Sequence, residues 1–102
     1  MINKFNAYFD FSGKFKFENF KAEFLKHYNN TENDKLILII DLENRNIGLT
    51  DLFNFIKIRK FFDRLGVEKL QKTIVCCKDG KKKDIIKGFL KKYPPEREVV
   101  FY

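Results

Sequence analysis

The sequence predicts a single small α/β domain with a mostly parallel sheet. Three observations support this: a length of 102 residues, a composition of 44% hydrophobic and 34% charged residues, and apolar runs that alternate with helical patterns. A chain of this length fits one domain and can bury about two thirds of its unfolded surface. Strands that alternate with helices predict an α/β sandwich over residues 1–102, with four to five strands and about three helices.

The first half of the chain predicts a strand, a helix and a central strand. In "FNAYFDF", residues 5–11, every second residue is apolar, which is typical of a strand with one buried face. Ser12-Gly13 ends this strand, and "KFKF" after it could add a hairpin arm to the sheet. Apolar residues at three- and four-residue spacing from Phe17 to Tyr28 then predict a helix. The continuous apolar run in "KLILIID" predicts a central strand covered on both faces.

The second half predicts two more helix and strand pairs. Residues 50–65 form a helical pattern that Gly66 ends. "KTIVCC" predicts a strand, and the following helix stops at Pro94-Pro95 before a last strand in "REVVFY". Gly88 costs that helix about 1 kcal/mol relative to Ala, so either close packing requires it or the helix is weakened. Right-handed crossovers are expected between the strands.

Composition limits the class of protein. Thirteen Phe and no Trp predict a core built largely from phenyl rings. The apolar run at Leu36 is far shorter than the ~20 residues that span a bilayer, and the N-terminus lacks a signal-peptide pattern. We therefore expect a soluble, cytoplasmic protein without a transmembrane segment. Cys76 and Cys77 are adjacent in a strand, so their side chains should point to opposite faces as thiols.

Charge is distributed unevenly between the two halves. Residues 1–55 carry seven Lys/Arg and eight Asp/Glu, a net −1, whereas residues 56–102 carry fourteen and six, a net +8. The sum is the overall +7. Such asymmetry allows association with an acidic protein, anionic lipid or nucleic acid.

The order of these elements resembles the STAS domain, the fold of anti-sigma-factor antagonists and of the cytoplasmic tails of sulfate transporters. The resemblance rests on a strand ending in "SG", an apolar strand ending in "IIDL", and a Thr-initiated helix "TDLFNFIKIRKFFDRLG". It covers nearly the whole chain and implies a protein-binding regulatory domain. In that family a Ser at the start of the second helix is phosphorylated, which carries over to Thr50. Leu49, Asp51 and Leu52 depart from the rest of the family motif Asp-Ser-Ser-Gly.

Thr50 also has a purely structural interpretation, because a Thr at the N-cap accepts an N–H from the first helical turn. Asp51 in that turn favours the positive end of the helix dipole and would repel a phosphate on Thr50. Asp41 is interpreted similarly, as a loop acid that orders the turn "LENRN". We expect the partner-binding surface between residues 44 and 54, with candidate contacts at Asn44, Asn46, Thr50, Asp51 and Asn54.

An enzyme is not expected. The chain has one histidine, His27, which a helical packing position explains, and it lacks a P-loop, a nucleophile elbow or metal-ligand spacing. Neither a cofactor nor a metal is implied. The alternative function is a basic module that binds nucleic acid or an anionic membrane through the last helix. Its candidate anion-binding residues are Lys81, Lys82, Lys83, Lys87, Lys91 and Lys92. A homodimer stays an alternative if "VVFY" lies at a sheet edge.

Overall fold

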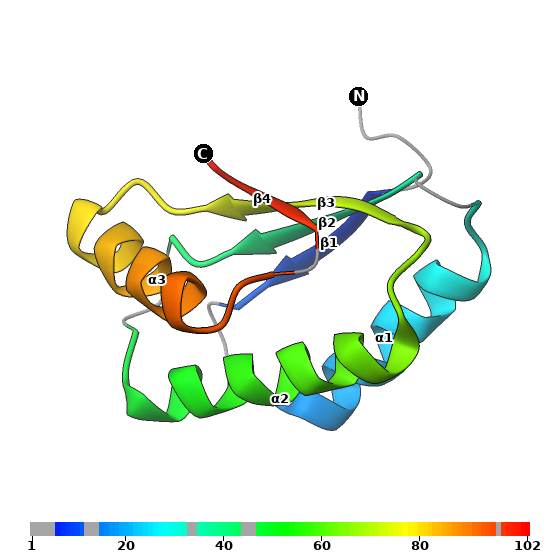
Figure 1. Ribbon diagram of the computed structural model, residues 1–102, viewed down its shortest axis with the longest axis horizontal. Helices are drawn as coiled ribbons and strands as arrows, with labels where there is room; N and C mark the ends of the chain where they lie inside the picture. The colour runs from blue at the N-terminus through cyan, green and yellow to red at the C-terminus, as the bar shows by residue number, and fades with distance from the viewer. Residues whose placement is uncertain (1–5, 12–14, 33–34, 44–46, 96) are drawn as a thin grey trace.

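The computed structural model describes residues 6–11, 15–32, 35–43, 47–95 and 97–102. Within these residues four strands alternate with three helices (Figure 1). The elements are β1 (Asn6–Asp10), α1 (Phe17–Asn29), β2 (Leu36–Asp41), α2 (Leu49–Leu65), β3 (Leu70–Cys76), α3 (Gly80–Lys92) and β4 (Glu98–Phe101). The α/β class and the parallel sheet predicted from the sequence are confirmed, and the arrangement is consistent with a STAS-like sandwich.

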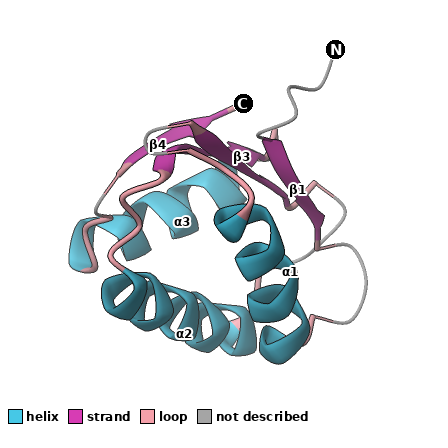
Figure 2. Ribbon diagram, turned by 90° about the vertical axis from the view of Figure 1, so that its right-hand side faces the viewer, coloured by secondary structure: helices cyan, strands magenta, loops and turns pink. Residues whose placement is uncertain are grey.

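The described strands form one parallel sheet in the order β1-β2-β3-β4. Because each connection moves to the next strand in the same direction and with the same hand, every helix is placed on the same face of the sheet. Figure 2 shows this arrangement, with α1, α2 and α3 all below the sheet. Within the described part of the chain, the opposite face carries no helix. β4 pairs only with β3 and is therefore an edge strand of this sheet.

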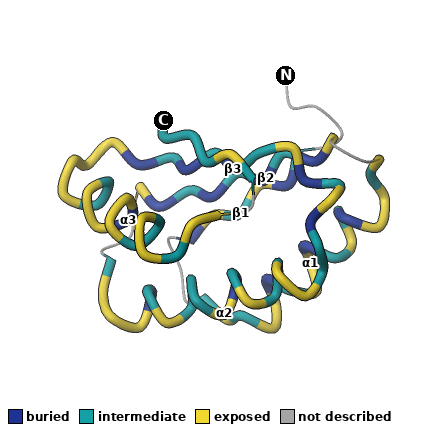
Figure 3. The backbone as a smooth tube through the Cα atoms, in the orientation of Figure 1, coloured by how far each residue is buried: buried dark blue, intermediate teal, exposed yellow. Residues whose placement is uncertain are grey.

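The predicted coverage of β2 on both faces is wrong. Leu36, Leu38 and Ile40 are buried, and the alternate residues of the strand are only half-buried (Figure 3). The reason is the one-sided arrangement of the helices, which leaves one face of the sheet open. On that face the register aligns Tyr8 with Ile39 and Ile39 with Ile74. The predicted hairpin arm is also absent from the described sheet, because Phe15 and Lys16 have no strand structure and α1 begins at Phe17.

Phenyl rings form much of the core between β1, α1 and α2, as the composition predicted. Ring centroids lie 4.7 Å apart for Phe9 and Phe20, and 4.9 Å apart for Phe24 and Phe62. Phe24 is fully buried. Tilted aromatic pairs stabilise packing beyond the contribution of their buried area. These ring contacts therefore help to hold α1 and α2 against each other and against the sheet.

The helix ends follow the predicted stop signals. Gly66 adopts φ 87°, a left-handed conformation, and its N–H donates to the carbonyl of Phe62 over 2.9 Å. α3 ends at Lys92, just before Pro94. Its start has a signal that the sequence analysis missed: the Asp79 carboxylate accepts the N–H of Lys81 and of Lys82. Among the described helices none is long and apolar enough to cross a membrane.

Candidate functional site

The start of α2 is capped differently from the prediction. α2 begins at Leu49 with Gly48 as its N-cap, so Thr50 is the second helical residue and not the cap. The carboxylate of Asp51 accepts the N–H of Gly48 over 3.0 Å, and the N–H of Asp51 donates to the carbonyl of Gly48 over 3.1 Å. The bond from the Gly48 N–H to the Asp51 carboxylate is the half of a capping box that the acid supplies; Gly48 has no side chain to supply the other half, and its carbonyl accepts the Asp51 N–H instead. Asp51, three residues after the cap, fixes the start of α2. The cap therefore lies two residues before the predicted cap at Thr50.

This start exposes a small apolar surface. Leu49 is 70% exposed and Phe53 is 58% exposed, and Thr50 between them is also exposed. Residues four apart lie on the same side of a helix, so Leu49 and Phe53 are neighbours on its solvent side. We call Leu49, Thr50 and Phe53 the α2-start patch. The two apolar members were not among the candidate contacts predicted from the sequence, which were polar residues; the offset of Leu49 and Phe53 from buried Ile58 around the helix was the available signal.

The other predicted partner contacts have different positions. Asp51 is only 7% exposed, and its carboxylate is engaged at the helix cap. Asn54 is half-buried in the second turn of α2. Asn44 and Asn46 lie outside the described residues. Among the described residues of the predicted set, Thr50 is therefore the one that is exposed at the start of α2.

Tyr8 in the middle of β1 and Asp41 at the carboxyl end of β2 form a polar pair on the open face of the sheet. The Tyr8 hydroxyl donates to Oδ2 of Asp41, and the N–H of Glu43 donates to Oδ1 of Asp41 over 3.0 Å. The hydrogen bond from Tyr8, and to a smaller extent the one from Glu43, holds the pKa of Asp41 below its ordinary value. The same Tyr8 bond is the largest cause that raises the pKa of Tyr8 to about 12. The bond to Glu43 agrees with the interpretation of Asp41 as an acid that orders its turn, although residues 44–46 of that turn lie outside the described residues.

Cys76 lies beside Asp41 in the sheet register and is half-buried, whereas Cys77 is fully buried. Burial first, and then the charges of Asp41 and Glu43, raise the pKa of the Cys76 thiol. A protonated thiol is a poor nucleophile, so this arrangement does not prepare Cys76 for covalent chemistry. Within the described ranges no three His, Cys, Asp or Glu side chains converge as a metal site would require. His27 packs edge-on against Phe9, with ring centroids 6.3 Å apart.

The lysines of α3 divide into two groups. Lys82 and Lys83 are half-buried, and Nζ of Lys82 donates to the carbonyls of Leu42 and Glu43 over 3.3 and 3.0 Å. Lys82 therefore ties α3 to the end of β2. The exposed group consists of Lys81, Lys87, Lys91 and Lys92. Within it, Nζ of Lys87 lies 5.5 Å from the ring centroid of Phe101, and Nζ of Lys92 lies 6.0 Å from that of Tyr93.

An apolar cavity of about 110 Å³ lies between α2, α3 and the sheet, lined by core side chains such as Ile58, Phe62 and Phe89. It is smaller than the roughly 150 Å³ cavity of an engineered core that admits benzene. We interpret it as a loosely packed part of the core.

No family model matches the chain, and no curated protein or solved structure matches it either. The case for a function therefore rests on the residues and geometry described above.

Proposed function

We propose that this chain is a non-enzymatic, STAS-like domain that binds a partner protein through the α2-start patch. The exposure of Leu49 and Phe53 carries the proposal. Fully burying a Leu or Phe side chain contributes about 1.5–3 kcal/mol, so a partner that covers both has a substantial driving force. Isolated surface apolar residues are common, but here two large ones adjoin on one helix side, and such adjoining residues favour an interface.

Thr50 is proposed as the regulatory position of this patch. Thr50 is exposed and lies between Leu49 and Phe53 in the first turns of α2, and the resemblance to STAS domains assigns the phosphoacceptor to this position. A phosphate here would place about two negative charges among apolar contacts and near the Asp51 carboxylate. We expect Thr50→Glu to weaken partner binding while leaving the fold intact, as circular dichroism and titration calorimetry would show.

The test is capture of native extract on the immobilised chain, with nuclease treatment and a salt step, followed by mass spectrometry. Wild type is compared with Leu49→Ser/Phe53→Ser and with the matched control Ile85→Ser/Tyr102→Ser, which alters other exposed apolar residues, 41% and 74% exposed. The proposal predicts a defined protein retained by wild type and by the control and lost from the Leu49→Ser/Phe53→Ser variant. Equal retention by all three would refute the docking surface.

The second candidate function is a basic module that binds nucleic acid or an anionic membrane. The exposed lysines of α3 favour it, because phosphate attraction depends on such a surface and is strongly salt dependent. Charge reversal by Lys87→Glu/Lys91→Glu would then abolish retention, and the retained material would be salt-labile. A cytoplasmic location fits both candidates, since Cys76 and Cys77 are free thiols.

A further inference from the structure

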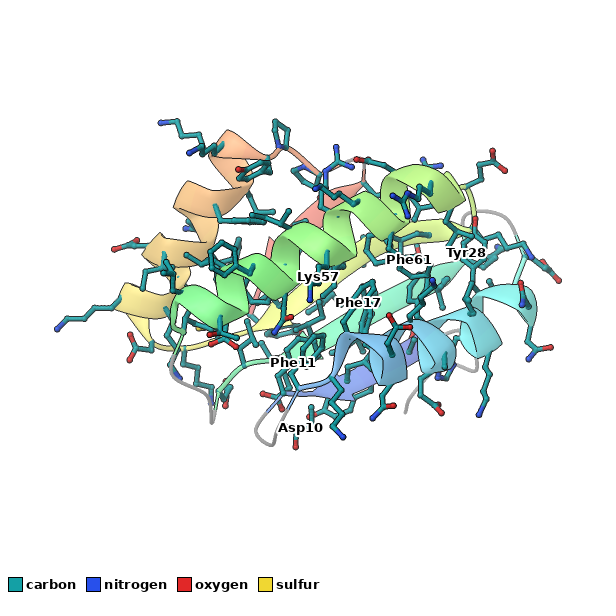
Figure 4. All side chains as sticks on the ribbon, turned by 90° about the horizontal axis from the view of Figure 1, so that it is seen from below. Asp10, Phe11, Phe17, Tyr28, Lys57 and Phe61 are labelled. Atoms are coloured by element: carbon teal, nitrogen blue, oxygen red, sulfur yellow. The ribbon has the colours of Figure 1, made fainter. Side chains whose placement is uncertain are left out.

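A groove runs between α1 and α2 and continues the solvent side of α2 beyond the α2-start patch. Its volume is about 490 Å³. Figure 4 views this side of the molecule and shows Phe17 and Phe61 between the two helices, with Lys57 on α2. We call it the α1–α2 groove. It is lined by Phe17, Lys21 and Leu25 of α1 and by Lys57, Lys60, Phe61, Arg64 and Leu65 of α2.

The floor of the groove is apolar and held in place from below. Phe17 and Phe61 meet edge-on with ring centroids 6.1 Å apart and an interplanar angle of 84°. Phe61 also packs against buried Phe24, with centroids 5.8 Å apart. Leu25 and Leu65 complete the floor, and all four lining apolar residues are half-buried. A ligand would therefore meet a preformed apolar surface, which reduces the entropy lost on binding.

The rim of the groove is cationic. Lys57, Lys60 and Arg64 are exposed on α2, and Nζ of Lys21 lies 5.7 Å from the ring centroid of Phe61. Among the described residues, the lining contains four cations and no carboxylate. Like charges three and four residues apart disfavour one another, so an acidic ligand would relieve this repulsion as well as pair with the rim.

The dimensions suit a short helix. From Phe17 to Leu25 the α1 side of the floor advances eight residues, or about 12 Å, which equals roughly two helical turns. An amphipathic helix that docks in a groove presents apolar side chains at i, i+3 or i+4, and i+7, over the same length. Such side chains can reach the recessed floor while carboxylates on the flanks face the cations.

The same geometry disfavours other anionic ligands. A flat bilayer would meet the ends of the exposed cations before it reached the half-buried floor. A nucleic-acid base would need an open aromatic face on which to stack. Phe17 and Phe61 are both half-buried and meet edge-on, so together they present no continuous aromatic plane.

We propose that the α1–α2 groove binds an acidic amphipathic helix of the partner protein. Leu or Phe side chains of that helix lie over Phe17 and Phe61, and its Asp or Glu residues pair with Lys57, Lys60 and Arg64. This inference rests on the proposed function, because it gives the chemistry of the partner segment that lies along α2. It adds a site that can be tested without the natural partner.

The test uses synthetic sixteen-residue helical peptides with Leu or Phe at i, i+4 and i+7 and Glu at flanking positions, labelled for fluorescence anisotropy. A second set carries Lys in place of Glu. The protein variants are Lys57→Glu/Lys60→Glu and the matched control Lys87→Glu/Lys91→Glu, which changes net charge equally on α3. Since each peptide is defined, no extract is needed.

We expect the Glu peptides to bind wild type and the α3 control alike, and to bind Lys57→Glu/Lys60→Glu about tenfold more weakly. The Lys peptides should bind this variant better than wild type. No binding of any Glu peptide to wild type, or equal weakening by both variants, would overturn the proposal. If the groove variant bound peptides normally but the Leu49→Ser/Phe53→Ser variant lost the captured protein, the proposed function would stand and the groove chemistry would be wrong.

Discussion

At the scale of single residues, three neighbours at the start of α2 have separate roles. Asp51 closes the helix end on Gly48, Thr50 is exposed in the first turn, and Phe53 is exposed one turn later. The sequence indicated that a helix starts here, but Thr50 and Gly48 both suit a cap position. The choice depends on where the Asp51 carboxylate can reach, which is a property of the folded loop.

The cap assignment predicts unequal effects of two neighbouring substitutions. Asp51→Ala should lower the free energy of unfolding by about 1 kcal/mol, because the N–H of Gly48 loses its acceptor. Thr50→Ala should change it by less than about 0.5 kcal/mol, as expected of an exposed position outside the cap. Urea unfolding measures both. A larger loss from Thr50→Ala than from Asp51→Ala would restore Thr50 as the cap.

The bond between Tyr8 and Asp41 predicts a pH dependence. A lowered carboxyl pKa stabilises the fold above the ordinary Asp value, and this stabilisation is lost as pH falls through the lowered pKa. A raised tyrosine pKa acts in the opposite range, and its stabilisation is lost as pH rises from about 10 toward 12. Tyr8→Phe should therefore raise the pKa of Asp41 in a carboxyl ¹³C NMR titration. Tyr102→Phe serves as control, and an unchanged Asp41 titration in Tyr8→Phe would show that the bond does not form.

At the scale of elements, local signals were most reliable where backbone chemistry leaves few choices. Gly66 ends α2 because its left-handed conformation favours glycine, and Pro94 stands beyond the end of α3 because proline cannot continue a helix. The apolar run of β2 was less informative. Its half-buried residues, Ile37 and Ile39, are as apolar as its buried ones, so the sequence could not show that helices cover only one face.

Two glycines predict opposite results for the same chemical change. An added Cβ at Gly88 meets no heavy atom within 4 Å, so Gly88→Ala should stabilise the chain by about 0.5–1 kcal/mol through helix propensity. This resolves the two explanations for Gly88 in favour of a weakened helix. Gly66→Ala should destabilise by about 1 kcal/mol, because Gly66 has φ 87°. Thermal and urea unfolding measure both variants. A change of the same sign in the free energy of unfolding of Gly88→Ala and Gly66→Ala would contradict this prediction.

At the scale of the whole molecule, the one-sided sheet determines which surfaces can serve a partner. All three described helices share one face, so the solvent side of α2 presents the α2-start patch and the α1–α2 groove along one element (Figure 4). The excess of cations in residues 56–102 was visible in the sequence. Which of these cations line the α1–α2 groove could not be predicted, because that depends on how each helix is rotated against the sheet.

The most direct test of the central claim, that the solvent side of α2 binds a partner protein, is calorimetric titration of the captured protein into purified variants. Loss of Leu49 and Phe53 removes apolar contact worth at least about 1.4 kcal/mol, which corresponds to about tenfold in Kd. We predict that Leu49→Ser/Phe53→Ser binds at least about tenfold more weakly than wild type, while Ile85→Ser/Tyr102→Ser binds equally. Equal affinity for wild type and Leu49→Ser/Phe53→Ser would contradict the account and place the partner elsewhere.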